Sequence, residues 1–150
     1  MFLNVFQRFY TFNICVIFCK FAYQIIKMIK SLLLVGFGGG IGSIFRYLTS
    51  FYISKYFPSK FPIGTFAVNL LGCFLIGLLV GYFEKNNLVN SDMKFLFVTG
   101  FCGGYTTFSA FGYENMNLFQ SNNTLLAFAY IGASLIFGLL AVWFGLFLSK

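Results

Sequence analysis

The chain contains no histidine and only three acidic residues among its 150 positions. Its four cysteines form no CxxC pair, so a zinc site or a Cys–His nucleophile lacks its usual side chains. We interpret these cysteines as small apolar side chains: Cys15, Cys19, Cys73 and Cys102.

Charge is scarce as well. Only 9% of the residues are charged and 59% are hydrophobic, which lies well outside the usage of soluble globular proteins. We therefore predict a polytopic membrane protein, and the 24 phenylalanines fit a surface that faces lipid. The ten lysines and arginines cap apolar segments and never cluster into a basic face with polar neighbours, so we expect no nucleic-acid partner.

Long polar stretches are missing, and no segment fits a soluble domain. A transmembrane helix needs about 20 apolar residues. Four segments meet that length, which predicts an all-α membrane protein with spans at residues 31–54, 63–83, 94–116 and 124–148. The connectors carry charged, amide and proline residues, as expected at a membrane interface.

Residues 1–27 are a separate segment. They are apolar, but Arg8 and Lys20 leave an uncharged run of 11 residues, which is too short to span. Met28 begins MIKSLLLVG, so we interpret residues 1–27 as an extension from a misassigned start and residues 28–150 as the functional unit. The alternatives are an interfacial amphipathic helix and a signal peptide, although no small-x-small cleavage site follows.

The first span contains GFGGGIGSIFRY. GxGxxG cannot be fitted to these glycines and no GK[ST] follows, so a nucleotide site is not predicted. Gly36 with Gly40, and Gly38 with Gly42, instead form small-xxx-small pairs that let another helix approach closely. Arg46 lies inside the span, where it can snorkel, fill a structural polar role or attract an anion.

The second span has one strongly polar side chain, Asn69. An amide at bilayer depth needs a hydrogen-bond partner, and Thr65 lies four residues earlier on the same face. Asn69 is therefore expected to join helices or to donate to a passing solute. Gly72, Gly77 and Gly81 add further positions for close packing.

The third span reads TGFCGGYTTFSAFGYE over residues 99–114. Gly103 and Gly104 weaken a helix, and Thr106 and Thr107 compete for backbone hydrogen bonds, so we expect a break near the middle of the span. Carbonyls freed by such a break are oxygen ligands for a small cation.

After the expected break, Phe108 and Phe111 share a face, with Ser109 between them. These rings either pack or turn their positive edges toward an anion. The fourth span adds Tyr130 and Ser134, one turn apart. Hydrogen-bond donors on three helices, without a membrane-embedded pair of carboxylates, favour a path for a dehydrated anion.

The stretches GFGGGIGSIFRY, GTFAVNLLGCFLIG and GFCGGYTTFSAFGYE together resemble the CrcB/Fluc family of fluoride channels. The resemblance runs from about Met28 to the C-terminus. It implies a four-helix subunit whose third helix is broken at mid-membrane, and an antiparallel, dual-topology homodimer with two fluoride pores. It also implies a central structural sodium ion, held by main-chain carbonyls of Gly103 and Thr106 from both subunits.

The same resemblance assigns the pore. It implies that fluoride contacts Asn69, Phe108, Phe111, Tyr130 and Ser134, and that supporting polar residues are Arg46, Thr107, Ser109 and Glu114. The fourth-helix track of hydroxyls departs from the family pattern at Gly138. We expect a channel in the cell inner (plasma) membrane, and no enzyme, that exports fluoride passively with the inside-negative potential.

Topology and mechanism each leave an alternative. From Met28 onward, one side of the membrane has Lys30, Lys85, Lys94 and Lys150 and the other has Lys55 and Lys60, a weak bias compatible with insertion both ways. The extension would add three charges to the first side. The rival function is a small four-helix proton-coupled cation or multidrug exporter, which would need a carboxylate in its first helix. A purely structural protein would explain the glycines but not the donors.

Overall fold

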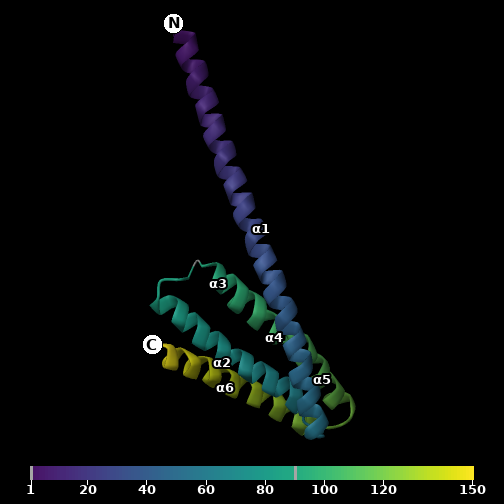
Figure 1. Ribbon diagram of the computed structural model, residues 1–150. Coiled ribbons are helices and arrows are strands. Elements are labelled where there is room, and N and C mark those ends of the chain that lie inside the picture. Colours follow the sequence, from purple (N-terminus) through teal and green to yellow (C-terminus); the bar gives the residue numbers. More distant parts are fainter. Residues whose placement is uncertain (1, 90) are drawn as a thin grey trace. The chain divides into compact units, whose positions relative to one another are not determined.

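The computed structural model describes the backbone of residues 2–89 and 91–150 and the side chains of residues 19–89 and 91–150. Within these ranges the chain is helical and contains no strand (Figure 1). The elements are α1 (Phe2–Tyr56), α2 (Ile63–Lys85), α3 (Asp92–Lys94), the π-helical η1 (Phe95–Cys102), α4 (Gly103–Tyr105), α5 (Phe108–Gln120) and α6 (Thr124–Ser149). The predicted all-α class is confirmed.

Three continuous helical segments in the described part of the chain are long and apolar enough to cross a membrane: Cys19–Tyr56, Ile63–Lys85 and Thr124–Ser149. The second and third of these begin at the residues where the sequence predicts a span to begin. The remaining predicted span, residues 94–116, is divided among four shorter helical elements from α3 to α5. It therefore differs from the other three in being discontinuous along the chain.

The chain forms two compact units, one ending at Leu33 and the other comprising Leu34–Lys150. The first unit consists of α1 residues alone, and its side chains from Cys19 to Lys30 are exposed. The second unit contains the rest of α1 and all later elements. The proposed division after residue 27 stays a prediction.

Within the second unit, α2 and α6 lie side by side and run in the same direction (Figure 1). Glycines permit this close approach. A Cβ added at Gly77 would collide with the Val142 carbonyl, and one added at Gly145 would collide with the Phe74 carbonyl. At Gly81 it would meet the Ser149 hydroxyl. The predicted close-packing role of Gly77 and Gly81 is confirmed.

Glycines also bring the later part of α1 against η1 and α4. A Cβ at Gly38 would collide with the Leu96 carbonyl, and one at Gly42 with the Phe101 carbonyl. Both residues therefore pack as the small-xxx-small pattern predicts. An added Cβ at Gly36 or Gly40 would meet no atom within 4 Å, so the Gly36–Gly40 pair packs against nothing in the part of the chain that the structure describes.

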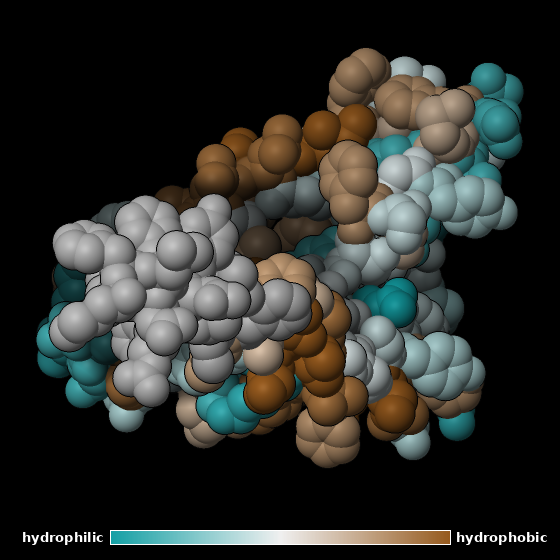
Figure 2. Space-filling model, turned by 90° about the horizontal axis from the view of Figure 1, so that it is seen from above, coloured by the Kyte–Doolittle hydropathy of each residue, from teal (hydrophilic) through white to brown (hydrophobic). Residues whose placement is uncertain are grey.

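Many large apolar side chains of the second unit lie at the surface rather than in the core. Phe37, Phe45, Leu139 and Trp143 are all exposed. Figure 2 shows apolar side chains, in brown, spread over one face of the molecule. Apolar surface of this extent requires lipid or another protein to cover it.

Candidate functional site

The helical backbone is interrupted between α4 and α5. Thr106 (φ −79°, ψ 154°) and Thr107 (φ −146°, ψ 120°) are both extended. The Thr107 hydroxyl caps α5 by accepting from the Ala110 N–H at 3.3 Å. We expected a break near the middle of the span from the two glycines together with the two threonines; Gly103 and Gly104 are helical, and the departure from helix lies at Thr106 and Thr107.

Asn69 on α2 pairs with this interruption through both ends of its amide. Its Nδ2 donates to the Thr107 carbonyl at 3.1 Å, and the Thr107 N–H donates to its Oδ1 at 2.8 Å. The expected partner Thr65 is wrong, because its hydroxyl donates elsewhere, to Glu114. Nδ2 carries two hydrogens, so one remains to donate to another group.

The carbonyl of Gly104, in the middle of α4, accepts hydrogen bonds from two side chains of α1. Arg46 Nε donates to it at 3.2 Å and the Ser43 hydroxyl at 3.4 Å. Gly104 also approaches α1 closely, since an added Cβ would collide with the Gly39 carbonyl. Of the roles considered for Arg46, the structure shows a structural polar contact to the interrupted segment.

The Gly103 and Thr106 carbonyls flank the same interruption. Because the Thr107 N–H donates to Asn69, it does not form the helical bond to the Gly103 carbonyl four residues earlier. The Thr106 N–H and hydroxyl both donate to the Cys102 carbonyl at 3.0 Å. The described residues contain no group of three His, Cys, Asp or Glu side chains that could hold a metal ion. A cation at this place would therefore depend on main-chain oxygens.

Glu114 on α5 connects α2 with α6. The Thr65 hydroxyl donates to its Oε1 at 2.6 Å, and the Tyr130 hydroxyl donates to its Oε2 at 2.9 Å. Tyr130 is fully buried and Thr65 is nearly so. Both carboxyl oxygens thus accept hydrogen bonds from hydroxyls, and the Tyr130 hydrogen is directed at the carboxylate.

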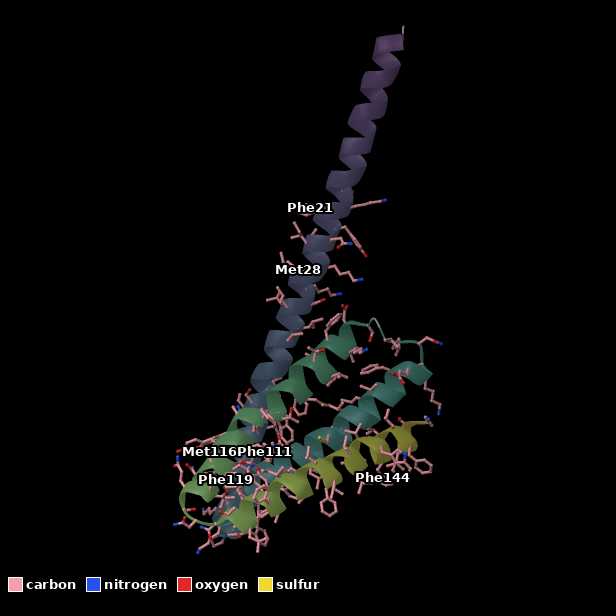
Figure 3. All side chains as sticks on the ribbon, turned by 180° about the vertical axis from the view of Figure 1, so that it is seen from behind. Phe21, Met28, Phe111, Met116, Phe119 and Phe144 are labelled. Carbon is pink, nitrogen blue, oxygen red and sulfur yellow. The ribbon has the colours of Figure 1, made fainter. Side chains whose placement is uncertain are left out.

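The two predicted phenylalanines have different surroundings. Phe111, labelled in Figure 3, packs edge-on against Tyr130, with ring centroids 4.9 Å apart. Phe108 contacts Phe111 at a centroid distance of 5.8 Å, yet 83% of its surface is exposed in the protomer. Packing within the protomer accounts for Phe111 but not for Phe108.

A small cavity of about 20 Å³ lies between α2 and α6, which is room for about one water-sized group. Its lining includes Asn69 and Ser134, so the structure brings these two predicted residues together. Cys73 and Gly138 also line it, and a Cβ at Gly138 would lie 3.7 Å from the Cys73 sulfur. A thiol therefore borders the position where the polar track of α6 loses a side chain.

A second cavity, of about 190 Å³, lies next to the interruption. Its lining contains Arg46, Thr65 and Thr107, which come from α1, α2 and the segment before α5. The guanidinium gives this cavity a positive edge, and the carboxylate of Glu114 is occupied by two hydroxyls. The region therefore holds one guanidinium and one carboxylate, and the carboxylate accepts hydrogen bonds from Thr65 and Tyr130.

Sequence reasoning missed two participating residues, Ser43 and Cys73, and the cavity-lining role of Thr65. Ser43 precedes Arg46 by three residues, a spacing that places both on one helix face. Cys73 follows Asn69 by four residues, so Thr65, Asn69 and Cys73 form one stripe on α2. These two spacings could have found Ser43, Cys73 and the cavity-lining role of Thr65.

Comparisons with known proteins match most of the chain, and they point to one family. A family model described as "CrcB-like protein, Camphor Resistance (CrcB)" matches residues 33–146. A protein of Flavobacterium psychrophilum named "Fluoride-specific ion channel FluC" is 52% identical over 121 residues, covering 81% of this chain and 98% of that protein. Proteins of the same name from Azobacteroides pseudotrichonymphae and Gloeothece citriformis are 48% and 45% identical, covering 82% and 79% of this chain and 98% and 96% of those proteins.

Proposed function

The chain belongs to the CrcB family, and from this premise we propose that it is a fluoride-selective ion channel through which cytoplasmic fluoride leaves the cell passively. The observation that carries the proposal is the 52% identity to a fluoride-specific channel over 81% of the chain. The protein is a multi-pass protein of the plasma membrane and is not an enzyme. The inside-negative potential drives an anion outward with about 2.3 kcal/mol per charge per 100 mV.

The proposed pore passes the residues gathered around Asn69. Fluoride is small and strongly hydrated, so a narrow pore must replace its water with protein donors. Asn69 has one amide hydrogen left after its bond to Thr107, and Ser134 shares a cavity with it. Phe108 and Phe111 would add their positive ring edges. Tyr130 would line the path through its ring, since its hydroxyl donates to Glu114.

A structural sodium ion would be held by the Gly103 and Thr106 carbonyls of two subunits. The residues fit this role because the Thr107 N–H is diverted to Asn69, which leaves the Gly103 carbonyl without that helical partner. When bound, the ion would supply positive charge to these carbonyl oxygens. Asn69 holds the extended Thr107, and Ser43 and Arg46 hold the carbonyl of Gly104 in the preceding α4.

We further propose that two copies assemble antiparallel, with the α4–α5 interruption at mid-membrane depth. The exposed Phe108 supports this assembly, because a ring assigned to the pore needs a second surface beside it. Gly36, Gly40 and Gly103, whose added Cβ atoms would meet nothing, leave room for that surface. The two sides of the membrane differ little in their number of lysines, which is compatible with both orientations.

A proton-coupled exporter is the disfavoured alternative. Such a transporter needs a membrane-embedded carboxylate that takes up and releases protons. Residues 1–83 contain no Asp or Glu, so the first two predicted spans have no carboxylate, and Glu84 follows the second span near the end of α2. Glu114 has both oxygens bonded to hydroxyls.

Ion efflux from liposomes tests the proposal directly. Purified protein should release fluoride and essentially no chloride, because the donors and the narrow bore favour the smaller ion. Efflux should proceed without a proton gradient. Comparable chloride efflux, or a requirement for a proton gradient, would overturn the channel assignment.

A further inference from the structure

The small cavity between α2 and α6 is bordered by three side chains that can each donate a hydrogen bond. Asn69 and Cys73 come from α2, four residues apart, and Ser134 comes from α6. The volume of about 20 Å³ admits one water-sized particle. A site of this size can hold a single dehydrated ion, but not an ion together with its hydration shell.

Each of these three side chains has a donor to spare. Asn69 keeps one amide hydrogen after its bond to the Thr107 carbonyl. Within the described part of the chain, neither the Ser134 hydroxyl nor the Cys73 thiol forms a hydrogen bond with another residue, and the thiol is not in a disulfide. Three spare donors around one desolvated space favour a hydrogen-bond acceptor as its occupant.

Gly138 leaves the Cys73 thiol uncovered on the side of α6. A Cβ added at Gly138 would lie 3.7 Å from the Cys73 sulfur, which is an ordinary van der Waals contact. At Gly145, by contrast, an added Cβ would collide with the Phe74 carbonyl. Close packing of the two helices therefore requires glycine at position 145 but not at position 138. At this level of the cavity, the thiol is the polar group that α2 supplies and α6 lacks.

The donor set suits an anion rather than a cation. No charged side chain is among the described residues that line the cavity. The Asn69 Oδ1 already accepts from the Thr107 N–H, so the amide offers a hydrogen and not an oxygen to the cavity. A thiol is a weak donor, but its hydrogen bond strengthens when the acceptor is ionised.

We propose that the Cys73 thiol donates a hydrogen bond to the permeating anion in this cavity, together with the Asn69 amide and the Ser134 hydroxyl. The proposal rests on the fluoride-channel function stated above. It makes Cys73 a residue that determines how fast fluoride passes, and it gives the thiol a role beyond filling space between α2 and α6.

Fluoride efflux from liposomes tests the role of the thiol by moving its donor from α2 to α6. Cys73→Ala should slow efflux about tenfold, which is the lower end of what a hydrogen bond to an ion contributes. Adding Gly138→Ser should restore most of the efflux, because the serine hydroxyl enters the same space. Adding Gly138→Ala instead is the matched control, since it supplies volume without a donor and should restore none. Unchanged efflux in Cys73→Ala, or equal rescue by serine and alanine, would overturn the proposal.

Infrared spectroscopy of the full-length protein detects the thiol directly, even if Cys73→Ala fails to fold. Replacing chloride by fluoride in the buffer should shift an S–H stretching band to lower frequency, because a hydrogen bond weakens the S–H bond. The shift should vanish in Cys73→Ser, which keeps the other three thiols.

The two measurements together separate this proposal from the channel function. Unaltered protein that passes fluoride but shows no shift, or a shift that persists in Cys73→Ser, would overturn the role of Cys73 alone. Unaltered protein that passes no fluoride would overturn the channel function, and the role of Cys73 with it.

Discussion

Among single residues, Asn69 has the most demanding position, because one amide serves both the fold and the proposed pore. Its two hydrogen bonds pair with the N–H and the carbonyl of Thr107, whose backbone is extended. Asn69→Leu should lower thermal stability, since each unpaired polar group costs about 1–3 kcal/mol, and should also reduce fluoride efflux.

Ser134→Ala provides the matched comparison. It removes a hydroxyl from the same cavity but leaves the Thr107 pairing intact. Its efflux should fall while its melting temperature in detergent stays near that of the unaltered protein. If Asn69→Leu also melts at the temperature of the unaltered protein, the hydrogen bonds of Asn69 do not stabilise the interruption between α4 and α5.

Phe108 and Phe111 allow packing to be separated from ion contact. Replacing Phe111 by Leu or Met should cost about 1 kcal/mol, because its ring packs on Tyr130, whereas Phe108 is exposed in the protomer. If the ring edges contact fluoride, both positions should lose most efflux, since no aliphatic side chain restores the quadrupole. Size-exclusion chromatography beside each efflux assay verifies the dimer. Normal efflux in both Leu variants would show that the two rings only pack and do not contact the ion.

At the scale of elements, glycine contacts hold α1 against the interrupted segment. Gly42→Ala should destabilise the protein by about 1–3 kcal/mol, because its Cβ would collide with the Phe101 carbonyl, a backbone atom. Gly132→Ala, in α6, is the control. An added Cβ there meets nothing, and alanine favours helix over glycine. Thermal unfolding in detergent compares the two, and equal stabilities would contradict the packing assigned to Gly42.

The interruption itself combines local and distant causes. Thr107 caps α5 with its own hydroxyl, a preference that sequence alone reveals. The backbone N–H and carbonyl of Thr107 are hydrogen-bonded to Asn69, which lies 38 residues earlier on another helix. A π-helical stretch, in which the Gly103 N–H reaches the Val98 carbonyl, leads into the segment.

At the scale of the whole molecule, the N-terminal segment is separable from the channel unit. A chain beginning at Met28 should express, dimerise and transport fluoride like the full chain, because the family match begins at residue 33 and the second compact unit at Leu34. Efflux and size-exclusion chromatography of both chains make the comparison. Loss of folding or transport would show that residues 1–27 are structural.

The sequence by itself determined the properties that depend on neighbours along the chain. Scarce charge and apolar length specified a helical membrane protein, and the starts of α2 and α6 follow directly from Pro62 and Asn123, where the apolar runs begin. The Gly38–Gly42 pairing was also predictable, since a four-residue spacing places both glycines on one face.

Only the tertiary structure decided which polar groups meet. Spacing suggested Thr65 for Asn69, but the helices bring Asn69 to Thr107 and Thr65 to Glu114, 49 residues away. It likewise placed Cys73 beside Gly138 and left Gly36 and Gly40 without neighbours in the protomer. Periodicity reports which face of a helix a residue occupies. Which helix lies opposite depends on close approaches between backbones, and a one-dimensional pattern does not contain those distances.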